Sequence, residues 1–348
     1  MLHEVLERII KTKRSREPAS PPSEQKPFLE ILTEIGEARK NGPPVLADYQ
    51  INWNLVAIGV TPKHLEKLEP TIRALAESMK PHNLGILLLV ARESWQTQGL
   101  PENVRVIVSG SFTANWLRDC YFPTAKGLIE KPGRRLSPKL TPFILNQSPD
   151  LQIESYWGIS FLRGGDVMTG ENDVFVGGMT WSYLLDELGA EKAKESLRVF
   201  FRKENVVAVP WDLIYEEDIP IPCGDLDSYL TVLGEKIVLV GKEINLQICP
   251  NTFWFLETTA RMLEENGFRV LRVPFVGRRQ QTYNNVLIHG PKGLVFVPQY
   301  GEKDRLYSQA AAVYKQAGYT PIPIPFLISF SRSNFGQLRC LTFPLPSS

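Results

Sequence analysis

The stretch TYNNVLIHGPKGLVFVPQYG, residues 282–301, predicts two strands joined by a tight turn. Residues 286–288 and 294–297 are apolar runs, and the segment GPKG lies between them. Glycine tolerates positive φ and proline fixes φ near a turn value, so this punctuation between apolar runs indicates a hairpin. The second run is apolar almost throughout, which favours a strand covered on both faces.

The same pattern recurs at residues 161–178 (FLRGGDVMTGENDVFVGG), at 228–241 (SYLTVLGEKIVLVG) and, more weakly, at 116–129 (WLRDCYFPTAKGLI). Similarity that recurs roughly every 50–60 residues is typical of a radially repeated or barrel-like array. The alternative is that any β-rich protein contains several hairpins. The repeat is favoured because similar helical segments follow the later copies.

The segments around the hairpins complete α/β units. Predicted helices cover residues 62–79, 181–197, 252–266 and 304–317, and predicted strands cover 55–60, 84–90, 104–108, 206–210, 268–273 and 320–325. Each unit needs its neighbours to bury both faces of its sheet, so we expect one closed domain. A last strand, residues 338–343, is expected to complete the first unit and close the ring.

The first 44 residues form an N-terminal extension in this interpretation, and residues 45–348 form the single domain. Residues 1–10 could form a short amphipathic helix. They do not resemble a signal peptide, because charged residues interrupt the segment and no long apolar core follows it. Residues 11–26 are polar and proline-rich, as in a flexible linker. The basic start of that linker could contact nucleic acid or another protein, or be a solvated tail. Apolar residues at helical spacing predict a helix over residues 27–40.

Composition excludes several classes of protein. The chain has 348 residues, 43% hydrophobic and 22% charged, and its net charge is +1 from 39 basic and 38 acidic residues. This balance calls for no nucleic acid and no membrane surface as partner, and no apolar stretch reaches the roughly 20 residues of a membrane span. The four cysteines and four histidines are scattered. We therefore expect no metal, no cofactor, no disulfide framework and a cytoplasmic setting with reduced thiols.

Residues that could carry chemistry lie in or beside the hairpins, so a radial array would direct them to a shared centre. They are Arg118-Asp119, the segment Arg163-Gly164-Gly165-Asp166, the segment Gly224-Asp225-Leu226-Asp227, and Arg339-Cys340.

With these segments the sequence resembles the pentein superfamily of guanidino-group-modifying enzymes, arginine deiminase and agmatine deiminase in particular. The resemblance covers roughly residues 50 to 345 by order and spacing of motifs. Five segments carry the resemblance. WLRDCYFP resembles W-x-R-D-x-x-P with one extra residue, LRGGDV resembles L-E-G-G-D-V, and DLDSYLTVL resembles H-L-D-x-x-F-T-x-L. YNNVLIHGPKGLVFVPQYG resembles Y-x-N-F-x-I-x-N-x-x-V-x-V-P-x-Y-G, and QLRCLTFPL resembles x-x-R-C-M-S-x-P-L. The resemblance implies an αβ-propeller of five pseudo-symmetric ββαβ-type units around a central pocket.

The resemblance also implies a chemistry. In that superfamily a cysteine thiolate attacks a guanidinium carbon, an amine leaves, and the covalent intermediate passes to water or to an acceptor amine. Cys340 matches the nucleophile, while Asp119 and Asp227 match carboxylates that pair with the planar guanidinium. An inert buried cysteine and ordinary turn aspartates are the alternatives. The residues expected to bind substrate are Trp116, Arg118, Arg163, Asp166, Asn284 and Arg339.

Two positions depart from the pattern, because the glutamate of L-E-G-G-D is Arg163 and the histidine of H-L-D is Asp225. An arginine about 4 Å from a substrate guanidinium would cost on the order of 4 kcal/mol at an effective dielectric near 20, which disfavours arginine and agmatine as substrates. The replacements are complementary in charge, so Arg163 and Asp225 could pair inside the pocket; the alternative is that both turn to solvent.

Two functions remain open at this point. The first is a hydrolase or amidinotransferase of altered specificity on a guanidino- or amidino-like small molecule. Arg163 or Arg339 would then lower the pKa of Cys340, Asp225 or Asp227 would handle protons, and Arg163 would recruit a carboxylate-bearing or neutral amidine-like substrate. The second is a pentein without catalysis that binds a small molecule or a regulatory partner. A homo-oligomer is compatible with either function.

Overall fold

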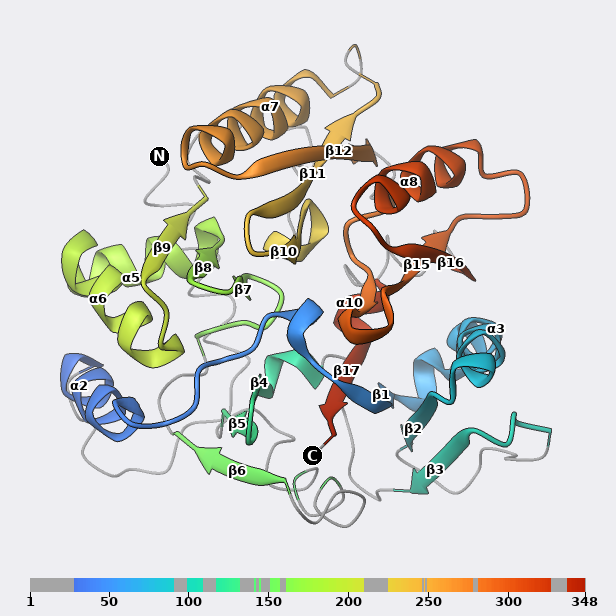
Figure 1. The fold of residues 1–348 in the computed structure, drawn as a ribbon, viewed down its shortest axis with the longest axis horizontal. Coiled ribbons are helices and arrows are strands. Elements are labelled where there is room, and N and C mark those ends of the chain that lie inside the picture. Colours follow the sequence, from blue (N-terminus) through green and yellow to red (C-terminus); the bar gives the residue numbers. More distant parts are fainter. Residues whose placement is uncertain are drawn as a thin grey trace.

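The computed structural model describes residues 28–90, 99–108, 117–131, 141, 144, 151–156, 161–209, 225–245, 247, 249–277, 281–326 and 337–347. Five small sheets surround a common centre, with the helices toward the outside (Figure 1). The order of units along the chain is also their order around the ring, as the blue-to-red colouring shows. This arrangement confirms the predicted ring of repeated α/β units around a common centre.

The first unit joins the two ends of the described chain. Its sheet has the strand order β17-β1-β2-β3, built from β1 (Trp53–Val60), β2 (Gly85–Val90), β3 (Val104–Val108) and β17 (Thr342–Pro346). Strand β17 runs antiparallel to β1, with Ala57 opposite Phe343, whereas β2 is parallel to both of its neighbours. Helix α3 (Pro62–Met79) packs its apolar face on this sheet. The predicted closure of the ring by the last strand is confirmed.

The other four units repeat one pattern: an antiparallel hairpin whose second strand is followed by a parallel strand. The second unit contains β4 (Tyr121–Thr124), β5 (Gly127–Glu130) and β6 (Gln152–Ser155), and the third contains β7 (Val167–Thr169), β8 (Asp173–Val176) and β9 (Asn205–Ala208). The fourth contains β10 (Leu230–Gly234), β11 (Ile237–Glu243), β12 (Arg269–Val276) and β13 (Gln281–Thr282). The fifth contains β14 (Leu287–His289), β15 (Leu294–Gln299) and β16 (Thr320–Pro325). The helices are α5 (Gly178–Leu188), α6 (Ala190–Phe201), α7 (Pro250–Glu265) and α8 (Arg305–Gln316).

The stretch that decides the fold forms the expected hairpin. Leu287 lies opposite Phe296 in the antiparallel pair β14–β15. Residues 290–292 form the short 3₁₀ helix η6 (Gly290–Lys292), and Gly293 ends it at φ +60°, a left-handed conformation that suits glycine. Val295 and Val297 are fully buried, as expected for a strand covered on both faces.

Two predicted elements differ from the structure. The helix expected over residues 181–197 is two helices, α5 and α6, because Gly189 between them has φ +74° and interrupts the helical backbone. The strand expected over residues 338–343 begins only at Thr342. Leu338–Leu341 is instead the short helix α10, which lies near the centre of the ring (Figure 1).

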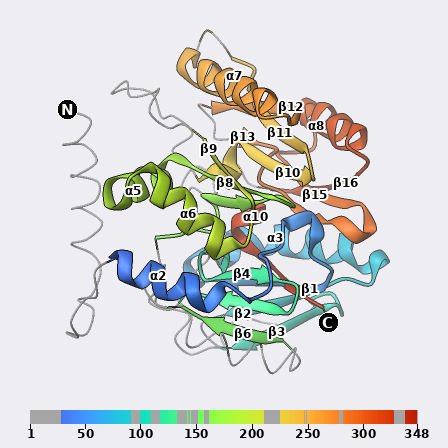
Figure 2. The same cartoon turned by 60° about the vertical axis from the view of Figure 1, so that its left-hand side comes forward.

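Helix α2 (Phe28–Arg39) lies against α6 (Figure 2). Its Leu32 and Ile35 are buried in the same apolar cluster as Phe200 and Phe201. Arg39 is fully buried, donates to the Phe200 carbonyl oxygen at 3.1 Å and pairs with Glu154 at 2.8 Å. Residues 28–39 are thus bound to the propeller, whereas the division of the chain at residue 45 stays a prediction.

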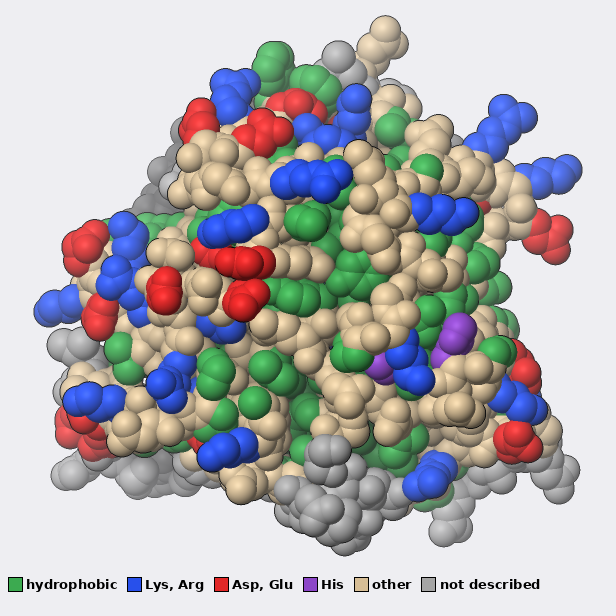
Figure 3. Space-filling model, viewed as in Figure 1, with side chains coloured by type: hydrophobic (Ala, Val, Ile, Leu, Met, Phe, Trp, Pro, Cys, Tyr) green, Lys and Arg blue, Asp and Glu red, His purple; other side chains and the backbone are tan. Residues whose placement is uncertain are grey.

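The surface carries both signs of charge. On the face in Figure 3, lysine and arginine side chains alternate with acidic ones, and hydrophobic side chains lie between them. In the described part of the chain, no helix is both long and apolar enough to span a bilayer. The predicted helix at residues 1–10 and the linker that follows it lie outside the described residues.

Candidate active site

Three short 3₁₀ helices and α10 meet at the centre of the ring. They are η1 (Asp48–Gln50), η3 (Leu117–Asp119), η4 (Leu226–Ser228) and α10, and each carries a charged residue that is buried there. Most of these charges come from hairpin-associated segments that are far apart in the sequence. Their convergence is the geometry on which the predicted chemistry depends.

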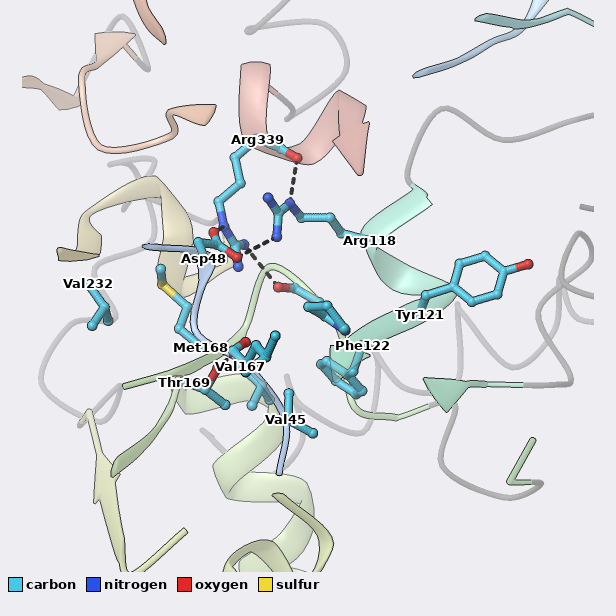
Figure 4. Close-up of a pocket in the computed structure, with 13 residues that line it drawn as sticks. Val45, Asp48, Arg118, Tyr121, Phe122, Val167, Met168, Thr169, Val232 and Arg339 are labelled. Carbon is cyan, nitrogen blue, oxygen red and sulfur yellow. Dashed lines mark hydrogen bonds and ion pairs between the residues drawn. The ribbon is translucent and has the colours of Figure 1, made fainter. Parts of the chain in front are cut away.

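Asp48 links two buried arginines. Its Oδ1 lies 2.8 Å from Arg118 Nη1 and its Oδ2 lies 2.7 Å from Arg339 Nε (Figure 4). Arg118 Nε also donates to the Arg339 carbonyl oxygen at 2.9 Å. Burial opposes the charge of Asp48, but the two arginines outweigh burial and lower its pKa to about 2.

Sequence reasoning missed Asp48, which no motif marks. Only an indirect inference was available: two arginines predicted at the centre would need carboxylate partners if they were buried, but the sequence does not show which carboxylates these are. Arg118 and Arg339 were predicted to bind substrate. The structure pairs both guanidinium groups with Asp48 and with other protein acceptors, while Arg118 Nη2 has no hydrogen-bond partner among the described residues. Substrate binding by these two arginines stays a prediction.

Arg339 connects this pair to the carboxylate beside the thiol. Its Nη1 donates to Asp227 Oδ2 at 2.8 Å and to the Gly164 carbonyl oxygen at 3.0 Å. Asp227 is fully buried and its Oδ1 has no hydrogen-bond partner. Burial therefore raises the pKa of Asp227 although Arg339 acts in the opposite direction.

Cys340 lies in α10, two residues before β17 begins, and is partly exposed. Its thiol donates to Asp227 Oδ2 at 3.4 Å, and Asn285 Nδ2 donates to its sulfur at 3.1 Å. Burial and the charge of Asp227 raise the pKa of the thiol well above its ordinary value. The net shift is upward, opposite to the predicted lowering by Arg163 or Arg339, because burial and Asp227 outweigh the nearby cations. Arg339 is itself paired with Asp48 and Asp227.

Asn285, rather than the predicted Asn284, is the asparagine at the thiol. Its Oδ1 accepts from the backbone nitrogens of Arg339 at 2.8 Å and Cys340 at 3.3 Å, which fixes the amide so that its NH₂ faces the sulfur. Asn284 is fully buried and donates instead to Thr231 Oγ1 and to the Leu239 carbonyl oxygen. The two asparagines lie in a bend between β13 and β14 and their side chains reach different partners, so a shift of one position separates the two roles.

Arg163 and Asp225 form the pair that their complementary replacement suggested. Arg163 Nη2 lies 3.1 Å from Asp225 Oδ1 and 3.2 Å from Oδ2, and the side chains are 29% and 15% exposed. Burial raises the pKa of Asp225 to about 8; Arg163 opposes this shift, and Asp166, Asp119 and Asp227 add to it. The alternative in which both side chains turn to solvent is wrong.

The Gly164-Gly165 segment passes between these charged groups without side chains of its own. Gly164 N donates to Asp119 Oδ1 at 3.1 Å, and Gly165 O accepts from Asp227 N at 2.9 Å. A Cβ on Gly164 would lie 2.0 Å from the Arg118 carbonyl oxygen. The glycines therefore allow the close approach that brings Asp119 and Asp227 to one site.

Asp166, predicted to bind substrate, is buried behind this segment. Its Oδ2 accepts from Thr180 N at 2.7 Å, in the first turn of α5, and a Cβ on Gly177 would lie 1.9 Å from its Oδ1. Burial raises the pKa of Asp166 to about 6 against these hydrogen bonds. Trp116 and Gly224, also singled out from the sequence, lie outside the described residues.

A cavity of about 20 Å³, roughly the space of one water molecule, adjoins the Asp48 side of the cluster. Asp48, Arg118, Arg339 and Thr169 are its polar lining residues, and Cys340 does not line it (Figure 4). Within the described ranges, no three His, Cys, Asp or Glu side chains are arranged to hold a metal ion.

Comparison with known proteins gives a relationship in structure only. No protein-family model matches the chain, and no curated protein matches its sequence. Among solved structures, the agmatine deiminase of C. jejuni superposes with a TM-score of 0.69 at 15% identity, over 88% of this chain and 96% of that one. The agmatine deiminase of Enterococcus faecalis superposes with a TM-score of 0.67 at 14% identity, over 89% and 97%.

These likenesses define the class: the chain has the fold of the pentein superfamily over 88% to 89% of its length. The sequence resemblance is confirmed at this level. At such low identity the fold does not transfer an activity, so function has to be argued from the site itself.

Proposed function

We propose that this protein is a thiol-dependent enzyme that breaks a C–N bond of a guanidino- or amidino-like small molecule through a covalent Cys340 intermediate. The observation that carries the proposal is the thiol hydrogen bond from Cys340 to Asp227, 3.4 Å long, in a partly exposed position at the centre of the ring. A nucleophile in hydrogen-bond contact with a buried base is the arrangement that covalent catalysis requires.

In the proposed first step, Asp227 accepts the thiol proton as the sulfur attacks the amidine carbon. A C–S bond forms, a C–N bond then breaks, and the leaving amine takes a proton from an acidic group of the site. The raised pKa of Asp227 makes it a stronger base than an ordinary aspartate. The carboxyl of Asp225, with a pKa of about 8, is suited to supply the proton near neutral pH.

In the second step, water or an acceptor amine attacks the same carbon and gives a proton to the Asp225 carboxylate that the first step left behind. The C–S bond breaks, and the sulfur leaves as a thiolate that takes its proton back from Asp227. Attack by water makes the protein a hydrolase, and attack by an amine makes it an amidinotransferase. Asn285 donates to the sulfur and stabilises the thiolate that forms at the end of this step.

One observation favours a second candidate function, a binding protein without catalysis. The pKa of Cys340 is raised rather than lowered, so little thiolate is present at neutral pH without assistance from Asp227. In that case the centre of the ring would hold a ligand without reacting with it.

Thiol labelling and mass spectrometry separate the two functions. The purified protein is incubated with a panel of guanidino and amidino compounds, quenched in acid, and searched for an adduct on Cys340. An adduct on the wild type that is lost in Cys340→Ser, with release of amine, supports catalysis. Binding of a panel member without an adduct and without amine release supports the second candidate.

A further inference from the structure

Arg163 is a partly exposed cation of the site with hydrogen-bonding capacity to spare. Among the described residues, its contacts are Nη2 to Asp225 and a weak contact of Nη1 to Met179 Sδ at 3.9 Å. A guanidinium carries five N–H donors, so most donors of Arg163 are left for water or a ligand. The side chain is 29% exposed, whereas Arg118 and Arg339 are almost fully buried.

Asp225 neutralises Arg163 only in part. Both carboxylate oxygens approach a single guanidinium nitrogen, at 3.1 and 3.2 Å, instead of forming the two parallel bonds of a fork. The pKa of Asp225 is raised to about 8 by burial, with Asp166, Asp119 and Asp227 reinforcing the shift, so this carboxyl is mostly protonated at neutral pH. Arg163 therefore keeps a large part of its charge available.

Building on the proposed function, we infer that Arg163 selects substrates that carry a carboxylate, and binds that group at its open donors beside Cys340. The planar fork of a guanidinium matches a carboxylate. Arg163 pairs with Asp225, two residues before the Asp227 that accepts from the Cys340 thiol, so contacts link the guanidinium and the thiol in one site. A neutral amidine would leave these donors unpaired.

The surrounding charges also limit the kind of anion. Asp225 pairs with Arg163, and the charges of Asp119 and Asp166 also act on it. A dianion such as a phosphate ester would meet their repulsion twice over, whereas a single carboxylate meets it once. The site thus fits a monoanionic head group with an amidine or guanidine at the other end of the same molecule.

Calorimetry on the full-length Cys340→Ser protein, which cannot form the adduct, tests this inference. The probes are guanidinoacetate, 3-guanidinopropionate and 4-guanidinobutyrate, each paired with its uncharged amide. We expect at least one acid to bind about tenfold or more tightly than its amide, a difference typical of one charge-assisted pair. Adding Arg163→Gln should remove this preference, and Arg163→Lys should keep part of it.

Arg272 provides the matched control. Like Arg163 it is partly exposed (23%) and paired with a carboxylate, Glu257, at 2.7 Å, but it lies in β12 and none of the contacts described for the site involves it. Arg272→Gln should leave the preference for acids unchanged. Equal binding of acids and amides, no binding of any acid, or a preference that survives Arg163→Gln would overturn the inference. Should Arg163→Gln not fold, the acid-to-amide ratio of the Cys340→Ser protein decides alone.

The same measurements keep this inference separate from the proposed function. Acids that bind through Arg163 while the wild type forms no Cys340 adduct would leave the anion site standing without the enzyme. An adduct that forms equally well with acids and amides would support catalysis by Cys340 and contradict carboxylate selection by Arg163.

Discussion

The thiol of Cys340 donates a hydrogen bond to Oδ2 of Asp227, the same oxygen that accepts from Arg339 Nη1. One carboxylate oxygen thus raises the pKa of the thiol and also pairs with the Arg339 guanidinium. Because Asp227 both suppresses the thiolate and can serve as the base, its removal should change the alkylation rate and the turnover rate in opposite directions.

Asp227→Asn should speed alkylation of Cys340 by iodoacetamide and slow turnover. Removing the negative charge favours the thiolate, and a pKa drop of one unit gives up to about tenfold faster labelling below that pKa. Losing the base should cost roughly 10²–10⁴ in turnover of any substrate found. Labelling is followed at several pH values by mass spectrometry; slower labelling together with unchanged turnover would contradict both roles.

Asp48→Ala should be among the most destabilising single changes outside the apolar core. It leaves Arg118 and Arg339 without a shared counter-charge in a buried site, and such a loss costs about 3–5 kcal/mol. The free energy of unfolding is measured in urea. Glu195→Ala is the control, because Glu195 is 63% exposed and its pair with Arg198 is worth at most about 1 kcal/mol.

Asp225→Asn should change how stability depends on pH. The folded-state pKa of Asp225, about 8, lies above its unfolded value near 3.8, so the native state holds a proton that the unfolded state releases. Its contribution to stability is full below about pH 4 and is lost progressively as pH rises toward 8. The amide cannot ionise, so the variant should gain stability relative to the wild type between pH 5 and pH 8, measured by thermal melting. A constant difference across this range would contradict the raised pKa.

The hairpins and the ring could be predicted because their signals are local: apolar runs, turn residues and a repeated order. The partners of Arg339 could not, because Asp48 lies 291 residues away and belongs to a three-residue helix without a motif. Asn284 and Asn285 show a second limit. Sequence similarity located the pair, but only the backbone direction decides which amide faces Cys340.

Gly164→Ala should disrupt the site through its backbone. The new Cβ would lie 2.0 Å from the Arg118 carbonyl oxygen, and neither backbone can yield without moving the hydrogen bonds of Gly164 to Asp119 and Arg339. We expect a loss of about 3 kcal/mol or more in unfolding free energy, at the upper end of overpacking effects.

Gly170→Ala is the matched control, since it lies beside the β7–β8 turn and its Cβ would meet Phe175 at an ordinary 3.4 Å. That change should alter the free energy of unfolding by less than about 1 kcal/mol. Both variants are compared in urea, together with the alkylation rate of Cys340. If Gly164→Ala unfolded at the wild-type midpoint with an unchanged rate, the close approach of this segment to η3 would be wrong, and with it the convergence of Asp119 and Asp227 on one centre.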